Sequence, residues 1–187
     1  MAEFSPQQRF HYGENEFPEA YPFYERLRRG ASVLATCIQD GEEKILLGRR
    51  LKPGNRGKWI LPGGGIDGDE SAESAATREV LEEANVNITE PNLFTWMVFS
   101  DEHSDGSNGQ DRVVYWLTAE IKDPENIKGG SDLGEPRLFS RSELVELDDI
   151  SDVVRPVLIS AGWLPVDEQY ARSVTGTETG QYLDAYK

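Results

Sequence analysis

The stretch that most constrains this chain runs from Gly63 to Val86 and reads GGGIDGDESAESAATREVLEEANV. Its glycines and its Asp-Gly-Asp turn signal predict a loop, after which Ser71 can cap the start of a helix. Residues Ala72–Ala84 contain no Gly or Pro and are mostly good helix formers. Asn85 then stands where helices commonly end in a left-handed residue. The stretch therefore predicts a loop, a helix and a left-handed cap.

The predicted helix carries three carboxylates, Glu79, Glu82 and Glu83, within an arc of about 100°, since 3.6 residues make one turn. We expect the opposite side to face a core, and small residues beside the carboxylates to leave room for a substrate. The core-facing set is Thr77, Val80, Leu81 and Ala84, and the small set is Ala72, Ala75 and Ala76. Three like charges repel, but a cation such as Mg²⁺ takes carboxylate oxygens as ligands and would reverse that sign. The alternative is a solvated acidic face.

These residues resemble the Nudix box, G-x5-E-x7-R-E-U-x-E-E-x-G-U, in which U is a bulky aliphatic residue. Eight of the nine box positions match in type and spacing, namely Gly64, Glu70, Arg78, Glu79, Val80, Glu82, Glu83 and Val86. Asn85 replaces the last glycine, and Asn tolerates positive φ better than other residues with a side chain. The lead-in LLGRR…GKWILPGGG is also similar to that of many Nudix hydrolases, so the resemblance covers about Ala31–Leu164.

The resemblance implies an α/β fold, an α/β/α sandwich with a mixed β-sheet. It also implies an enzyme that uses Mg²⁺, or Mn²⁺, to direct water at a phosphorus of a nucleoside diphosphate derivative. Glu82 and Glu83 are the expected metal ligands. Glu79 is expected either to complete the metal shell or to accept a proton from water, and the Gly63 carbonyl is a further candidate ligand.

Other residues have expected roles around the box. Glu70 and Arg78 are expected to form an ion pair that ties the loop to the helix, with Gly64 as a further structural box residue. Four basic residues before the box could bind substrate phosphates or could be ordinary surface charges: Arg49, Arg50, Arg56 and Lys58. A general base from outside the box is common in the family, and Glu135 and the acids of the 101–111 loop, including Glu102, are the candidates. His103 is expected to be a loop residue rather than a base.

The remaining patterns predict the domain organisation. An aromatic-rich arm covers 1–30, the Nudix domain 31–165, and a polar tail 166–187. The arm is expected to hold a short helix over Glu19–Arg29 and to pack on its own domain, the alternative being a homodimer contact. Strands are predicted at Ala31–Gln39, Lys44–Arg50, Leu93–Phe99, Arg112–Ile121 and Asp132–Phe139, with a hairpin turn at Asp40–Gly41. Helices are predicted at Arg141–Leu147 and Asp152–Ala161.

Composition narrows the classes of partner. The net charge of −15 argues against a nucleic-acid surface, which needs a basic patch, yet bound cations keep a phosphate substrate possible. The single cysteine, Cys37, rules out a disulfide within the chain and is expected to be a small buried side chain. There is no signal-peptide pattern and no long apolar run, so we expect a cytoplasmic protein without a membrane partner.

The substrate is less constrained. Residues 100–104 lack the proline and the tyrosine that are typical of ADP-ribose and dinucleoside polyphosphate hydrolases in this family. The lead-in pattern favours a nucleotide sugar or a (deoxy)nucleoside triphosphate. Two alternatives stay open: a catalytically silent nucleotide-binding or regulatory module, and an isomerase or decapping relative. The sequence leaves open the number of metal ions, the base among the glutamates and the oligomeric state.

Overall fold

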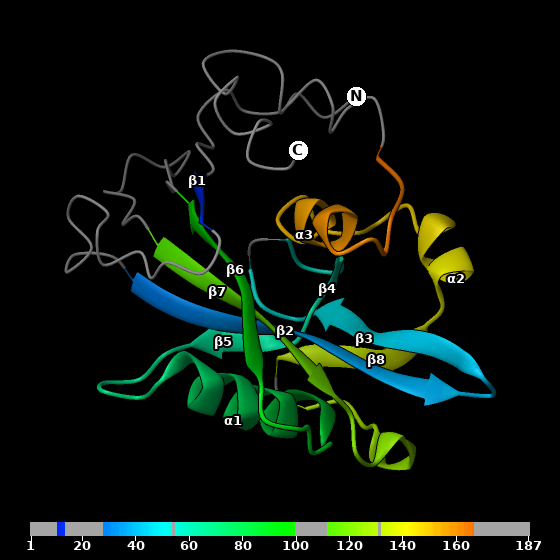
Figure 1. Cartoon of the computed structure of the whole chain (residues 1–187), viewed down its shortest axis with the longest axis horizontal. Coiled ribbons are helices and arrows are strands. Elements are labelled where there is room, and N and C mark those ends of the chain that lie inside the picture. The colour runs from blue at the N-terminus through cyan, green and yellow to red at the C-terminus, as the bar shows by residue number, and fades with distance from the viewer. Residues whose placement is uncertain (1–10, 14–27, 54, 100–111, 131, 167–187) are drawn as a thin grey trace.

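A mixed β-sheet covered by helices on both faces forms the body of the molecule (Figure 1). The computed structural model describes residues 11–13, 28–53, 55–99, 112–130 and 132–166. Helix α1 (Ala72–Ala84) lies on one face of the sheet, and helices α2 (Arg141–Val145) and α3 (Arg155–Ser160) lie on the other. This is the α/β/α sandwich with a mixed sheet that the resemblance to the Nudix box implies.

The sheet combines one parallel pair with antiparallel neighbours. Its strands are β1 (His11–Gly13), β2 (Arg28–Gln39), β3 (Glu42–Arg50), β4 (Trp59–Ile60), β5 (Gly63–Gly65), β6 (Asn92–Phe99), β7 (Arg112–Glu120) and β8 (Leu133–Phe139). The described strands follow the order β1-β6-β7-β2-β3-β4, with β5 paired to β2 and β8 paired to β3. Only β2 and β7 run parallel among these pairs, and a short 3₁₀ turn, η3 (Pro124–Asn126), lies between β7 and β8.

Most predicted elements are present within a few residues of their expected bounds. The turn at Asp40–Gly41 is confirmed, with φ of 55° and 78° at the two positions, values that suit a tight hairpin. The helix predicted over Glu19–Arg29 is wrong at its end, because Arg28 and Arg29 begin β2 and pair with β7. The last helix begins later than predicted, at Arg155, since a proline stands in its first turn, where its fixed φ suits a helix start.

Part of the N-terminal arm belongs to the sheet. His11–Gly13 forms β1 and pairs antiparallel with Trp96–Val98 of β6. This stretch of the arm packs on its own domain, as the sequence analysis favours. Residues 1–10 and 14–27, which carry the other aromatic side chains of the arm, lie outside the described residues, so the homodimer contact stays a prediction.

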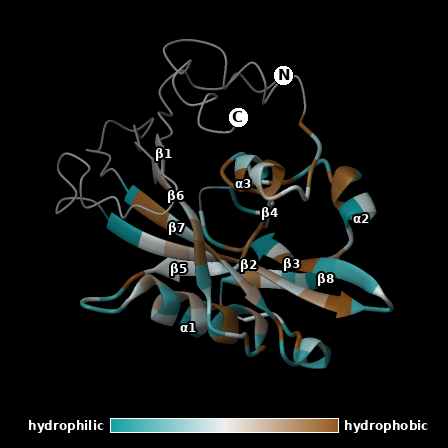
Figure 2. Ribbon diagram, viewed as in Figure 1, coloured by the Kyte–Doolittle hydropathy of each residue, from teal (hydrophilic) through white to brown (hydrophobic). Residues whose placement is uncertain are grey.

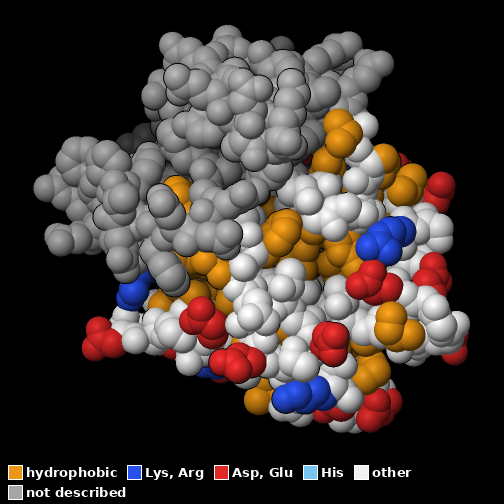
Figure 3. All heavy atoms as spheres, viewed as in Figure 1, with side chains coloured by type: hydrophobic (Ala, Val, Ile, Leu, Met, Phe, Trp, Pro, Cys, Tyr) orange, Lys and Arg blue, Asp and Glu red, His pale blue; other side chains and the backbone are white. Residues whose placement is uncertain are grey.

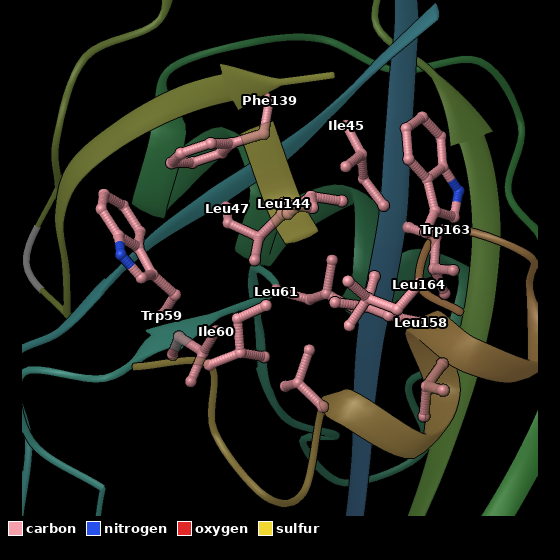
Figure 4. Packing of buried hydrophobic residues seen from close by; sticks show 14 of the residues in the cluster. Ile45, Leu47, Trp59, Ile60, Leu61, Phe139, Leu144, Leu158, Trp163 and Leu164 are labelled. Atoms are coloured by element: carbon pink, nitrogen blue, oxygen red, sulfur yellow. The ribbon is translucent and has the colours of Figure 1, made fainter. Parts of the chain in front are cut away.

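Two hydrophobic cores hold the helices to the sheet. The core on the side of α2 and α3 contains Trp59 and Phe139, whose rings meet edge to face with centroids 4.8 Å apart, and Figure 4 shows Trp163 at its other end. The core under α1 includes Cys37, which is 9% exposed, as predicted. Figure 2 shows that α3 is mostly hydrophobic and that the end of the β2–β3 hairpin is hydrophilic. The sheet is thus buried on both faces around the middle of β2 and β3.

The chain carries a formal net charge of −15. On the face seen in Figure 3, Asp and Glu side chains are spread widely, and the Lys and Arg side chains of the described residues stand at separate places. Among the described residues, no helix is both long enough and apolar enough to cross a membrane.

Candidate active site

Helix α1 begins and ends as its sequence predicts. The Ser71 hydroxyl accepts a hydrogen bond from the Ser74 backbone N–H at 3.1 Å, which satisfies one of the unpaired donors of the first turn. At the other end Asn85 has a left-handed φ of 58°, and its backbone N–H donates to the Leu81 carbonyl. The Asn85 side chain also donates to the Asn126 carbonyl at 3.0 Å. Both ends of the helix are therefore fixed.

The buried face of α1 differs from the predicted one. Thr77 and Leu81 point outward, Leu81 being 48% exposed, whereas Ala75 and Ala76 are fully buried with Val80 and Ala84. The alanines pack against the sheet and do not border a substrate space. Glu83 is itself buried, at 3% exposure, and the Glu79 side chain is 12% exposed. The prediction is confirmed for Val80 and Ala84 and wrong for Thr77 and Leu81, because the buried arc extends to Glu79 and Glu83.

Glu83 is held by the glycine loop. The Gly63 backbone N–H donates to Glu83 Oε2 at 2.9 Å. Burial raises the pKa of Glu83 to about 7, and the charges of Glu79 and Asp132 act in the same direction. The Gly63 hydrogen bond and the charge of Lys52 oppose this rise. The site therefore concentrates negative charge around a carboxylate that is largely removed from water.

Glu79 lies against β5 at Gly64, where a side chain would push the carboxylate away. A Cβ atom at Gly64 would overlap the Glu79 carboxylate. Arg78, the neighbour of Glu79 on the helix, donates to Glu79 Oε1 at 2.7 Å. These contacts fix Glu79 between the loop and the helix.

Arg78 joins several acids and the loop. It forms the expected ion pair with Glu70 through two hydrogen bonds, of 3.1 and 2.9 Å, and also donates to the Gly65 carbonyl. It lies 3.6 Å from Glu82, whose side chain is 56% exposed. The Arg78 guanidinium lowers the pKa of Glu70, and its own pKa is raised by the bonds to Glu70 and Glu79. Arg78 thus ties the loop to the helix and partly neutralises the acids.

Two charged residues that the sequence analysis did not select lie at this site. Lys52 and Asp132 form an ion pair, and the charges of both act on Glu83. The segment that leads to Asp132 is held at the end of α1 by two backbone hydrogen bonds. The N–H groups of Lys128 and Gly130 donate to the carbonyls of Ala84 and Glu83. Lys52 and Asp132 lie far apart in the sequence and belong to no recognisable motif, so only the fold brings them together.

Two of the four basic residues predicted to bind phosphate, Arg49 and Lys58, pair with acids away from the carboxylates. Arg49 stacks over Trp59 at 4.2 Å from the ring centroid and pairs with Asp149, and Lys58 pairs with Asp152 at 3.0 Å. Both acids precede α3, on the face of the sheet opposite α1. Arg50 donates to the Pro53 carbonyl, and Arg56 is exposed in the following turn.

Of the two named candidates for a general base outside the box, the structure describes Glu135. Glu135 is exposed on β8 with a positive φ of 48°, at an irregularity in the pairing with β3. Glu102 and His103 lie outside the described residues. The acid from outside α1 whose charge raises the pKa of Glu83 is Asp132.

The acids suit a hard cation in chemistry, although their side chains are arranged around other partners. Within the described parts of the chain, no three His, Cys, Asp or Glu side chains are positioned to hold a metal ion as they stand. Arg78 binds Glu79 and lies near Glu82, while Gly63 binds Glu83. A cation could use the second oxygens of Glu79 and Glu82 together with Glu83 and Asp132, because Arg78 contacts Glu79 through Oε1 and Glu82 through Oε2. The donors are all oxygen, as Mg²⁺ and Mn²⁺ prefer.

Comparison with known proteins decides the family. A family model described as the NUDIX domain matches residues 28–160. The chain belongs to the Nudix family. It is 32% identical over 73 residues to the uncharacterized Nudix hydrolase YvcI of Bacillus subtilis, which covers 37% of this chain and 44% of that protein. It is 28% identical over 102 residues to the 8-oxo-dGTP diphosphatase of Proteus vulgaris, covering 53% of this chain and 85% of that protein.

The solved structures agree on the Nudix fold. The MutT NUDIX hydrolase of Burkholderia pseudomallei is 25% identical, with a TM-score of 0.55 over 70% of this chain and 95% of that one. The chain spans less than half the length of the first curated relatives that it matches. The likeness therefore concerns the Nudix domain.

In this Nudix domain the box residues form one connected cluster. Hydrogen bonds of Arg78 join Glu70, Glu79 and the loop, and the two aliphatic box positions, Val80 and Val86, are fully buried. The box position that departs from the family, Asn85, adopts the left-handed conformation that a glycine would adopt. The departure therefore leaves the end of α1 unchanged.

Proposed function

We propose that this Nudix domain hydrolyses the pyrophosphate linkage of a nucleoside diphosphate derivative, with Mg²⁺, or Mn²⁺, as its cofactor. The observation that carries the proposal is the buried Glu83, which is fixed by Gly63 and surrounded by the charges of Glu79 and Asp132. Burying a carboxylate among other carboxylates is costly unless a cation joins them. Family membership supports the same reaction class.

The residues have distinct proposed roles. Glu82, Glu83 and Asp132, with the Gly63 carbonyl, would hold the cation, which when bound polarises a phosphate and lowers the pKa of water. Glu79 is either a further ligand or the group that accepts a proton from the attacking water. Arg78 positions Glu79 through their 2.7 Å hydrogen bond. Glu135 and Glu102 remain candidates for an outside base, and Arg50 and Arg56 for phosphate contacts.

For the substrate we place (deoxy)nucleoside triphosphates first and nucleotide sugars second. The relative from Proteus vulgaris is named for action on 8-oxo-dGTP, a deoxynucleoside triphosphate, and it matches over 85% of its own length. The acidic character of the chain, with a net charge of −15, favours a small substrate carried with its cation over a nucleic acid. Such nucleotides belong to the cytoplasmic pool, where we propose that the protein acts.

The test is a panel of substrates assayed with Mg²⁺. The panel contains the four dNTPs, 8-oxo-dGTP, nucleotide sugars and dinucleoside polyphosphates, and chromatography resolves the products. We expect release of pyrophosphate or of a nucleoside monophosphate from at least one class. The Glu83→Gln variant should melt at a temperature no lower than that of wild type in metal-free buffer, and its turnover should fall about 10²-fold or more, the scale of a lost charge contact in a transition state.

Each other outcome of this assay has a defined meaning. If the turnover of Glu83→Gln is within threefold of that of wild type, Glu83 is not a ligand of the proposed metal site. Tight binding of a nucleotide without turnover would favour the regulatory module instead.

A further inference from the structure

Lys52 is a cation placed at the edge of the acid cluster, and the proposed reaction as set out above does not use it. We propose that Lys52 occupies Asp132 while no divalent cation is bound, and that it transfers to a phosphate of the substrate when the cation takes Asp132. Lys52 would then make cation binding and substrate binding depend on each other. This inference rests on the proposed hydrolase function.

Direct contacts place Lys52 at the cluster. Its ammonium group pairs with the Asp132 carboxylate, and its positive charge also acts on Glu79 and Glu83. Two other basic residues in or after β3, Arg49 and Lys58, pair with acids beside α3, on the other face of the sheet. Lys52, in contrast, brings its positive charge to the carboxylates of Asp132, Glu79 and Glu83.

The backbone fixes the approach of the two segments. The Leu51 backbone N–H donates to the Asp132 carbonyl at 3.0 Å, directly after the β3–β8 pair of Arg50 and Leu133. On the other side of Asp132, the Gly130 N–H donates to the Glu83 carbonyl at 2.9 Å, so closely that a Cβ atom at Gly130 would overlap the helix backbone. Lys52, Asp132 and Glu83 are thus held near one another by main-chain bonds.

Lys52 can leave its partner more easily than the other cation at the site. Its side chain is 59% exposed and carries a strongly hydrated charge on a flexible stem, and ion pairs of this exposure are weak. Arg78, in contrast, is bound to Glu70 by two hydrogen bonds and to the Gly65 carbonyl by another. Lys52 is therefore the cation that a metal ion would displace, whereas Arg78 would stay with Glu70.

The exchange predicts opposite effects on metal and on substrate. With Lys52 replaced by methionine, Asp132 has no competing ammonium, so a divalent cation should bind more tightly when no substrate is present. The substrate phosphates lose their lysine, so KM should rise while kcat changes little. Lys52→Arg keeps the positive charge and should restore most of both properties. A purely structural role for Lys52 would weaken both kinds of binding together.

The experiment measures Mn²⁺ binding by calorimetry, without nucleotide, on the full chain of wild type, Lys52→Met, Lys52→Arg and Lys44→Met. Lys44 is the matched control because it lies at the opposite end of β3, about 25 Å away along the strand, and bonds Gln39. We expect the Mn²⁺ Kd to fall about fivefold in Lys52→Met, the low end of couplings between sites. We expect KM for the best substrate to rise about tenfold or more in the same variant. Lys44→Met should match wild type in both.

Three results would overturn the inference in distinguishable ways. If wild type binds Mn²⁺ and turns over substrate, but Lys52→Met has the Mn²⁺ Kd and the KM of Lys44→Met, Lys52 has no role in exchange and the proposed function stands. If wild type neither binds Mn²⁺ nor turns over any substrate, the proposed function fails and the inference fails with it. A Lys52→Met variant that binds Mn²⁺ more weakly than wild type also contradicts the exchange.

Discussion

At the scale of single residues, Glu83 combines burial with a neighbourhood of like charge. A pKa near 7 means that the folded protein binds a proton more readily than the unfolded chain, where the Glu pKa is near 4.5. Ionisation of Glu83 as the pH rises from about 4.5 to about 7 therefore opposes folding when no metal ion is bound. Gly63 and Lys52 lessen this cost and do not remove it.

The first prediction follows from that pKa shift. In metal-free buffer, the contribution of Glu83 to the free energy of unfolding should fall as the pH rises from about 4.5 to about 7, by up to about 3 kcal/mol. Glu83→Gln has no such ionisation, so it should gain stability relative to wild type over this range. Urea unfolding at pH 5 and pH 8, with a chelator present, measures the difference. A constant difference at the two values would show that Glu83 ionises with its ordinary pKa.

Whether a site residue could be predicted from the sequence depends on how close its partners lie along the chain. Residue type predicted Ser71 and Asn85 as helix caps, and the box resemblance implied the Glu70–Arg78 pair, because each acts through neighbours on the same loop and helix. Lys52 and Asp132 could not be predicted, since their meeting depends on how β8 pairs with β3.

At the scale of elements, α1 is fixed by its C-terminal end as much as by its buried face. Asn85, Lys128 and Gly130 together satisfy carbonyl groups of the last turn, which helices otherwise leave to water. The capping residues and the absence of Gly and Pro predicted the bounds of α1 correctly, whereas the helical period placed Val80 and Ala84 correctly and Thr77 and Leu81 wrongly in the core. The assignment of the core-facing side relied on a stripe of large hydrophobic residues. In the structure, Ala75, Ala76 and the polar Glu83 are buried instead of Thr77 and Leu81.

The second prediction concerns this helix end. Asn85→Ala should cost about 1 kcal/mol of stability, because alanine is disfavoured at a φ of 58° and the bond to the Asn126 carbonyl is lost. Asn85→Gly should stay within about 0.5 kcal/mol of wild type, since glycine adopts this φ without strain and the same side-chain bond is lost. Urea midpoints at equal m-values give both numbers. A glycine variant less stable than the alanine variant would contradict the left-handed cap.

At the scale of the whole molecule, the fold class and the order of elements were within reach of sequence reasoning. Alternating hydrophobic stretches and turn residues indicated most strands, and the box resemblance implied the sandwich. The pairing of β1 with β6 was not foreseen, because three residues of an aromatic arm carry no strand pattern of their own. The net charge of −15 makes the folded molecule sensitive to cations in general.

The third prediction separates a specific cation from general screening. At fixed ionic strength, Mg²⁺ together with a non-hydrolysable nucleotide should raise the melting temperature. At a hundredfold excess over Kd the gain is about 2.7 kcal/mol, or roughly 5–10 °C for a domain of this size. Mg²⁺ alone should give less, because its sites are often completed by substrate phosphates. A variant with Gln at positions 79, 82 and 83 is the control. An equal rise in its melting temperature would mean that the three glutamates do not bind the cation and form only a solvated acidic face.

The dependence of the site on β8 also has a consequence for the time course of folding. Asp132 and Gly130 reach α1 through chain that is synthesised after the helix, and β2 must await β7 to form its parallel pair, as at Arg28 and Arg112. Contacts between distant segments slow folding, because the intervening loop must close first. During synthesis α1 would thus form before its acids are enclosed, and Glu83 would remain solvated. The nascent chain would acquire the proposed affinity for divalent cations only when β8 joins the sheet.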